Sequence, residues 1–254
     1  MRKISNSAPT LPQRLLLLGR GGADEGGGTT APPWSPGALP GLQLWFDTAV
    51  LAGFANGDPV PTWPDLSGGH RDAVQATTAA RPTYVSVGIN GRPVLRFDGA
   101  DDTMVIGNVS AQFPSAALLV IVASMGNANG QQDAYSTGAA TSGIWSYAGS
   151  SYDTCFSFAR HQNYRVPTPA GVHCYVVASD SGAWRMSVDG SWGPTLAGTF
   201  DGGPNHRLGV SPGYEGQPLL GDLGEVIAVS SSSLTTTDQA RLAGYLLAKW
   251  GVTL

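Results

Sequence analysis

Short stretches in which apolar and polar residues alternate dominate the chain after residue 40, and they predict β-strands. Residues 42–47 alternate in this way with a period of two, as expected of a strand with one buried face. Residues 116–124 form a nearly continuous apolar run, which is typical of a strand buried on both faces. Further strands are predicted at residues 60–65, 93–97, 103–106, 144–147, 154–158, 172–179, 184–188, 206–210 and 223–230.

One amphipathic helix is predicted near the end of the chain, over residues 236–249. Thr235 and Asp238 have the spacing of a capping box, with Asp in place of the usual Glu. Gly251 is placed to end the helix in the left-handed conformation. The apolar residues lie along one stripe of the helix, so we expect it to dock on a sheet.

Composition agrees with an all-β domain that contains many turns. The chain has 35 glycines and 18 prolines, while charged residues make up only 13%. Such a balance suits many short strands joined by tight turns. Asp189-Gly190 is one expected tight hairpin. The hydrophobic content of 42% is enough for a substantial core.

Residues 1–40 differ from the rest of the chain, because glycine and proline recur throughout them. A segment of this kind cannot bury enough apolar surface to fold alone. We therefore expect residues 1–40 to form an extended anchoring arm and residues 41–254 to form the folded domain. Within the arm, one short apolar run is the candidate partner-binding segment: Leu15, Leu16, Leu17 and Leu18.

Charge and hydropathy argue against several classes of function. The net charge is −4 and no dense basic stripe follows residue 20, so we expect no nucleic-acid binding. No apolar run is long enough for a membrane span. The leucine run at residues 15–18 is too short and too closely flanked by Arg14 and Arg20 for a signal peptide, so we expect no secretion by that route.

Three groups of segments resemble the concanavalin A-like lectin/glucanase superfamily, in the laminin-G-like and pentraxin-like branches found in phage and bacterial proteins. They are residues 41–47 (Gly-Leu-Gln-Leu-Trp-Phe-Asp) with 60–68, residues 81–84 with 90–99, and residues 224–227 with 234–235 and 245–251. The resemblance implies a two-sheet antiparallel jelly-roll sandwich with one C-terminal α-helix. It implies little about the ligand, since this fold has binding, structural and catalytic members.

The acidic residues do not form the motif of glycosidases on this fold, which carry Glu-x-Asp-x-Glu or a close variant on one strand. Retaining hydrolysis needs two carboxylates about 5–5.5 Å apart. The chain has three glutamates, Glu25, Glu215 and Glu225, and all three are isolated in the sequence. His161, His173 and His206 likewise lack the spacing of a catalytic triad. We therefore expect the protein not to be an enzyme.

Asp98, Asp101 and Asp102 form the densest carboxylate cluster. Relatives in the superfamily often hold Ca²⁺ with loop carboxylates, and calcium takes six to eight oxygen ligands. The alternative is a turn in which Asp98 caps backbone N–H groups and Asp102 leads into the next strand. We expect no cofactor, and calcium at this loop is the one metal left open.

Aromatic residues near Gly/Ser-rich loops are the candidate carbohydrate-binding side chains, because aromatic faces stack on sugars. They are Trp145, Tyr147, Tyr152 and Trp192. Trp45 and Trp63 belong to the framework motifs and are expected in the core. Cys155 and Cys174 are expected to be free thiols, with a disulfide between neighbouring strands as the alternative.

Together these features predict a non-enzymatic structural or adhesion component of a phage virion, as a capsid decoration, fibre or tail protein. The arm would anchor it to other virion proteins in an oligomeric assembly formed in the host cytoplasm. The sandwich would bind cell-surface glycans weakly. The alternative is a soluble bacterial carbohydrate-binding, lectin-like domain. A glycan-active enzyme with an unrecognised site is the third hypothesis.

Overall fold

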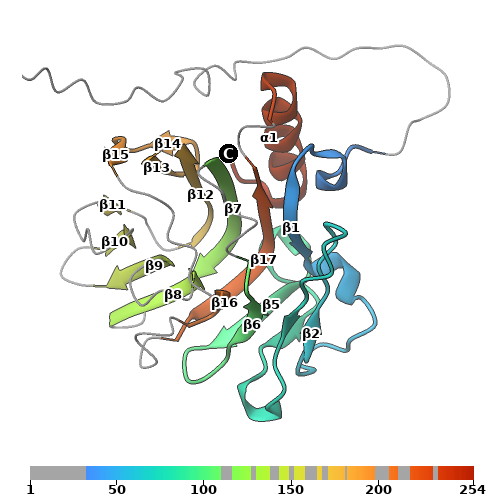
Figure 1. Cartoon of the computed structure of the whole chain (residues 1–254). Coiled ribbons are helices and arrows are strands. Elements are labelled where there is room, and N and C mark those ends of the chain that lie inside the picture. The colour runs from blue at the N-terminus through green and yellow to red at the C-terminus, as the bar shows by residue number, and fades with distance from the viewer. Residues whose placement is uncertain are drawn as a thin grey trace, which may run out of the picture.

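The structure is a computed structural model that describes residues 33–109, 116–126, 130–137, 143–148, 152–157, 165–167, 171–180, 182–197, 206–210, 218–230 and 234–254. Two antiparallel sheets and one C-terminal helix make up this part of the chain (Figure 1), which confirms the predicted all-β architecture. For residues 116, 130 and 131 and for the strands between 143 and 167, the backbone alone is described. The predicted arm before residue 33, with Leu15, Leu16, Leu17 and Leu18, lies outside the described residues.

The first sheet has nine strands among the described residues, in the order β14-β13-β12-β7-β17-β5-β4, with β1 paired to β17 and β15 paired to β13. Its strands are β1 (Leu42–Asp47), β4 (Thr83–Val85), β5 (Val94–Asp98), β7 (Ala116–Met125), β12 (Gly171–Asp180), β13 (Ala183–Val188), β14 (Ser191–Trp192), β15 (Leu196–Ala197) and β17 (Leu220–Val229). The tight turn at Asp189-Gly190 joins β13 to β14 with both φ angles positive, at 49° and 79°, as predicted.

The second sheet has eight strands in the described part, in the order β11-β10-β9-β8-β16-β6-β3-β2. They are β2 (Thr62–Trp63), β3 (Ala73–Val74), β6 (Met104–Gly107), β8 (Gly130–Ser136), β9 (Gly143–Ala148), β10 (Tyr152–Ser157), β11 (Arg165–Pro167) and β16 (His206–Leu208). Short 3-10 helices lie at η2 (Pro36–Ala38), η3 (Thr48–Leu51), η4 (Thr78–Ala80) and η5 (Ile89–Gly91).

Strand β7 is buried on both faces, as its apolar run predicts. Leu119 and Ile121 face the inner core between the sheets, where Trp63 is also fully buried. Leu118 and Val120 face the opposite side of the first sheet and belong to an outer apolar cluster with the helix. The first sheet is therefore the middle layer of the molecule, with the second sheet on one face and the helix on the other.

Helix α1 (Thr236–Trp250) begins and ends as the sequence predicts. Thr235 Oγ1 accepts from the Asp238 N–H at 3.2 Å, and Asp238 Oδ2 accepts from the Thr235 N–H at 3.1 Å, which completes the capping box. Gly251 ends the helix with a φ of 73°. Leu246 and Lys249 are buried, whereas Leu247 is 59% exposed on the solvent side.

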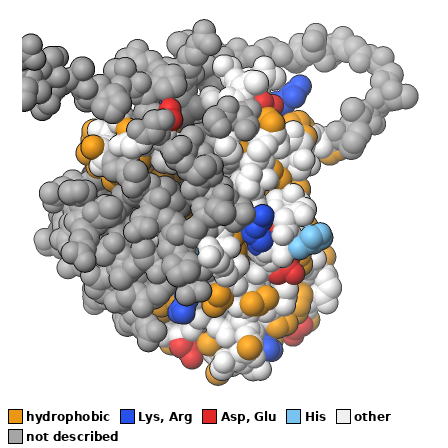
Figure 2. All heavy atoms as spheres, in the orientation of Figure 1, with side chains coloured by type: hydrophobic (Ala, Val, Ile, Leu, Met, Phe, Trp, Pro, Cys, Tyr) orange, Lys and Arg blue, Asp and Glu red, His pale blue; other side chains and the backbone are white. Residues whose placement is uncertain are grey.

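The segment just before β1 packs on the folded domain, although its composition groups it with the arm. Pro36 is buried in η2, and Leu39 is only 5% exposed within the outer cluster. On the face shown in Figure 2, the basic and acidic side chains of the described residues are interspersed. No helix in the described part of the chain has the length and apolar character needed to cross a membrane.

Candidate functional site

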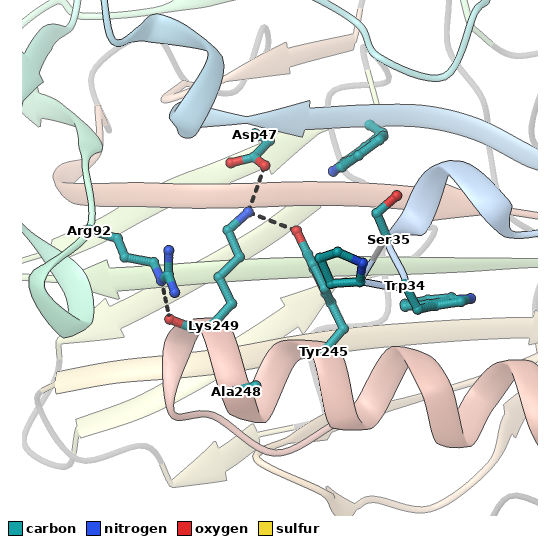
Figure 3. Close-up of a pocket in the computed structure, with 9 residues that line it drawn as sticks. Trp34, Ser35, Asp47, Arg92, Tyr245, Ala248 and Lys249 are labelled. Atoms are coloured by element: carbon teal, nitrogen blue, oxygen red, sulfur yellow. Dashed lines mark hydrogen bonds and ion pairs between the residues drawn. The ribbon is translucent and has the colours of Figure 1, made fainter. Parts of the chain in front are cut away.

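Two carboxylates lie side by side on the outer face of the first sheet. Strands β1 and β17 are antiparallel, and their register places Asp47 directly opposite Glu225. Like charges at opposed positions destabilise a sheet. Lys249 of α1 contacts both: its Nζ lies 2.6 Å from Asp47 Oδ2 (Figure 3). The same Nζ lies 3.1 Å from Glu225 Oε2. The lysine therefore offsets the repulsion and ties the helix to both strands.

Glu225 is 1% exposed, and its carboxylate accepts four hydrogen bonds. Trp45 Nε1 and Tyr245 OH donate to Oε1 at 2.7 and 2.8 Å, and Lys249 Nζ and Trp250 Nε1 donate to Oε2. Burial raises the pKa of Glu225, with repulsion from Asp47 adding to it, while Lys249 and the two indoles act in the opposite direction. Because indole N–H groups only donate, both oxygens are held as acceptors.

A pocket of about 440 Å³ opens beside this cluster, between the segment before β1, strand β1 and helix α1. Its walls include three half-buried aromatic side chains, Trp34, Trp45 and Tyr245. The rings of Trp34 and Tyr245 meet edge to face, with centroids 5.9 Å apart. The pocket is lined by Pro33, Trp34, Ser35, Trp45, Asp47, Arg92, Tyr245, Ala248 and Lys249. Figure 3 shows how the labelled side chains lie around it.

Arg92 brings an exposed cation to the mouth of the pocket. Its Nε donates to the Lys249 carbonyl at 2.8 Å, and Asn90 Nδ2 donates to the same carbonyl at 3.1 Å, so both side chains cap the end of α1. The terminal nitrogens of a guanidinium carry four further donors. The pocket thus combines aromatic faces, donors on Arg92 and an acceptor carboxylate on Asp47.

The three aspartates of the predicted calcium loop lie close together, with one carboxylate oxygen of each within 4.8 Å of the others. Asp98 Oδ1 accepts from the Ala100 N–H at 2.8 Å, and Asp102 Oδ2 accepts from the Asp98 N–H at 3.0 Å. These two hydrogen bonds fit the alternative to a calcium site, which is a turn capped by aspartate side chains. The same spacing would suit one cation, so calcium at Asp98, Asp101 and Asp102 stays a prediction.

The predicted carbohydrate-binding aromatics fall on different sheets. Trp145 and Tyr147 lie on β9 and Tyr152 lies on β10, both in the second sheet, and their side chains are outside the described residues. Trp192 lies on β14 in the first sheet, half-buried, with the Arg185 guanidinium 4.1 Å from its ring centroid. The backbone therefore does not place Trp192 on the same sheet as the other three.

The described candidate histidines and the described cysteine are held by contacts within the folded domain or are buried in it. His206 is buried and its Nδ1 lies 2.6 Å from the Tyr135 hydroxyl. His173 Nδ1 lies 2.6 Å from Asp189 Oδ2 at the β13–β14 turn. Cys174 is a buried free thiol whose pKa is raised by burial. His161 and the side chain of Cys155 lie outside the described residues.

The residues around the pocket were not predicted as a site, because their positions are far apart in the sequence. One signal was present: Lys249 falls on the otherwise apolar stripe of the helix, and a buried lysine calls for a carboxylate partner. Glu225, isolated in the sequence, has Asp47 and Lys249 as neighbours in space. Trp45, expected in the core, instead lies half-buried and bonded to Glu225.

No family model matches the chain, and no curated protein matches it in sequence. Solved structures share its fold. Domain 4 of AbnA, a GH43 extracellular arabinanase from Geobacillus stearothermophilus, in complex with arabinotriose, aligns with a TM-score of 0.55 and 13% identity, over 81% of this chain and 99% of the domain. The binding domain of botulinum neurotoxin DC in complex with SialylT aligns with a TM-score of 0.52 and 10% identity, over 84% of this chain and 52% of the toxin chain.

The chain thus spans nearly all of the arabinanase domain and about half of the toxin chain. At these identities the comparisons establish a common β-sandwich architecture. The narrower resemblance to concanavalin A-like domains stays a prediction.

Proposed function

We propose that the chain is a non-enzymatic, glycan-binding module that serves as a structural or adhesion component of a phage virion. The observation that carries the binding part is the pocket beside α1, where Trp34, Trp45 and Tyr245 stand next to polar groups that are already fixed in place. Small-molecule sites generally combine apolar walls with a few convergent polar groups in this way.

The same pocket supports a role without catalysis. A retaining glycosidase needs one carboxylate free to attack and another free to donate a proton. Asp47 and Glu225 are neighbours, but the Lys249 ammonium lies between them and contacts both. Glu225 is also 1% exposed and accepts four hydrogen bonds, so its oxygens are committed to the fold.

The shared β-sandwich fold adds support for glycan binding. One structure with this fold is an arabinanase domain in complex with arabinotriose, and another is a toxin binding domain in complex with SialylT. The concanavalin A-like resemblance of the sequence motifs agrees with this class of ligand. We extend the ligand class to this chain as a proposal, since folds of this kind also occur without sugar ligands.

The virion role rests on the sequence of residues 1–40. A Gly/Pro-rich arm next to a compact sandwich suits a chain that is held by neighbouring subunits, and such an arm gains order when it binds. In this proposal the arm attaches the protein to other virion proteins and the sandwich projects outward. Residues 15–18 supply the apolar contact.

The binding proposal is tested with the full-length protein on a glycan array and with a labelled polysaccharide panel assayed for hydrolysis. We expect specific binding and no turnover. Turnover that disappears in a Glu225→Gln variant, provided the variant remains folded, would contradict the non-enzymatic role. Absence of binding to every glycan would contradict the adhesion role.

The assembly proposal is tested by deleting residues 1–32, which keeps the buried residues Pro36 and Leu39 on the domain. We expect the truncated chain to fold but to be absent from purified particles. Normal incorporation of the truncated chain would contradict anchoring by the arm. Strong glycan binding by the monomer, together with no incorporation of the intact chain, would favour the soluble lectin-like alternative.

A further inference from the structure

We propose that the pocket between Trp34, strand β1 and helix α1 is the glycan-binding site, and that its ligand is an uncharged sugar ring. This inference rests on the proposed glycan-binding function and goes further, because it names the location and the chemical class of the ligand. The volume of about 440 Å³ falls within the range of roughly 300–1,000 Å³ typical of small-molecule sites.

The aromatic walls supply stacking surfaces in a fixed arrangement. The planes of Trp34 and Tyr245 meet at 73°, so the two rings form a corner, and Trp45 also lines the pocket. Tyr245 is held by its hydroxyl, which donates to Glu225 and accepts from Lys249 at 2.7 Å. Trp45 is held by its indole N–H on Glu225. Two of the three aromatic walls are therefore positioned before any ligand arrives, which lowers the entropic cost of binding.

The polar groups at the pocket match hydroxyls, which both donate and accept hydrogen bonds. Arg92 presents the donors of its terminal nitrogens, since only its Nε is used at the end of α1. Each Asp47 carboxylate oxygen accepts one hydrogen bond, Oδ2 from Lys249 and Oδ1 from the Ala49 N–H. Each oxygen therefore has a further lone pair that can accept from a ligand. A ring carrying adjacent hydroxyls can donate to Asp47 and accept from Arg92 while one face stacks on an aromatic wall.

Charge selects an uncharged ligand. The pocket wall contains two cations, Arg92 and Lys249, and one carboxylate, Asp47. The buried carboxylate of Glu225 pairs with Lys249 behind the wall, so the formal charges of the four groups cancel. The Lys249 ammonium already donates to Asp47, Glu225 and Tyr245, which uses all three of its N–H groups. An acidic sugar would find Arg92 alone and would be repelled by Asp47, and a cationic ligand would be repelled by Arg92.

Calorimetric titration of the full chain tests the inference with uncharged trisaccharides, arabinotriose and maltotriose, and with an acidic one, trigalacturonate. We expect an uncharged trisaccharide to bind and the acidic one not to bind. Trp34→Ala and Arg92→Gln should each weaken binding by about tenfold, the loss of one stacking or charge-assisted contact. Leu247→Ala is the matched control, because Leu247 is exposed on the same helix and should leave binding unchanged.

Each outcome separates this inference from the broader proposal. Binding of trigalacturonate alone would overturn the uncharged ligand class. Binding that survives Trp34→Ala and Arg92→Gln but is lost in Trp192→Ala would move the site to β14 and leave the glycan-binding function intact. Failure to bind any member of a full glycan array would overturn both. Melting curves accompany each variant, and Arg92→Gln changes an exposed side chain, so it provides a result if Trp34→Ala does not fold.

Discussion

Lys249 is a single residue that joins three elements. Its Nζ bonds Asp47 on β1, Glu225 on β17 and Tyr245 on its own helix. A buried ion pair is seldom more stable than a well-packed apolar pair, but removing one partner leaves an uncompensated charge. Lys249 therefore fixes which face of α1 meets the sheet, and the carboxylates in turn need it because they lie opposite each other.

Replacing Lys249 with Met should lower the free energy of unfolding by about 3 kcal/mol near pH 8. Burial and Asp47 raise the pKa of Glu225, and loss of the cation raises it further. The folded variant then holds a proton that the unfolded chain has released, so its stability falls as the pH rises through that window. Urea unfolding at about pH 5 and about pH 8 should show the smaller deficit at the lower pH.

Arg241→Met is the matched control for this change, since Arg241 is an exposed cation on the same helix. It should change stability by less than about 0.5 kcal/mol at either pH. A Lys249→Met variant whose deficit is equal at both pH values would contradict the raised pKa of Glu225.

Asp102 gives a second pH-dependent prediction. Burial, with repulsion from Asp98 and Asp101, raises the pKa of its carboxyl to about 6, although the Asp98 N–H acts in the opposite direction. The folded chain keeps this proton where the unfolded chain has lost it, so stability falls as the pH rises from about 4 to about 6. Asp102→Asn should therefore raise the melting temperature, relative to the wild type, more at about pH 7.5 than at about pH 4.5.

The melting temperature of Asp102→Asn is measured with a chelator present. Asp101→Asn is the control, because it removes an exposed carboxylate and should give a smaller pH-dependent change in melting temperature. Equal effects at both pH values would contradict the raised pKa. Added Ca²⁺ that stabilises the wild type but not Asp102→Asn would support the calcium prediction for this loop. If Ca²⁺ stabilises neither protein, the remaining interpretation of this loop is the turn without a bound metal.

At the scale of elements, local patterns predicted the helix and most strands. The capping box at Thr235, the end at Gly251 and the apolar run of β7 are signals contained within a few residues. The strand predicted at residues 60–65 is only Thr62–Trp63 in the structure, because the flanking prolines cannot donate to a sheet. The order of strands was not predictable, since β17 pairs with β1, β5 and β7 through contacts far apart in sequence.

Docking of α1 depends on the absence of a side chain at Gly224. A Cβ there would lie 2.8 Å from the Trp250 ring, closer than carbon atoms pack. Gly224→Ala should therefore destabilise the protein by about 2 kcal/mol through overpacking. Gly244→Ala is the opposite control, because Gly244 faces open space within the helix and alanine should stabilise by about 1 kcal/mol. Thermal unfolding of both variants checks the signs, and equal effects would contradict the close packing.

At the scale of the whole molecule, composition predicts an arm over residues 1–40, whereas the end of that range packs on the folded domain. Pro36 is buried in η2, and Leu39 packs in the outer cluster with residues of α1. Proline and glycine content predicts poor folding in isolation, and it does not reveal that a neighbouring surface accepts the segment. The pocket was not predicted either, because Trp34, Asp47 and Tyr245 are far apart in the sequence. They come together only when the helix docks on the sheet.

Two truncations should separate the contribution of residues 1–32 to stability from that of residues 33–40. Removal of residues 1–32 should leave the melting temperature nearly unchanged. Removal of residues 1–40 also deletes Leu39 and Trp34 and should cost about 2 kcal/mol or more in lost apolar burial. Chemical unfolding of both proteins beside the full chain measures the difference. Equal stabilities would show that residues 33–40 contribute little to the folded domain.

The close approach of Gly224 to the Trp250 ring also bears on how this sequence can diverge. A larger side chain at position 224 on the strand leaves less room for the side chain at position 250 on the helix. A relative with alanine or serine at position 224 is therefore expected to carry a smaller residue at position 250. That smaller residue would also remove an indole donor from Glu225. A covarying trio of positions 224, 225 and 250 would then mark chains in which the helix rests on the sheet in this same manner.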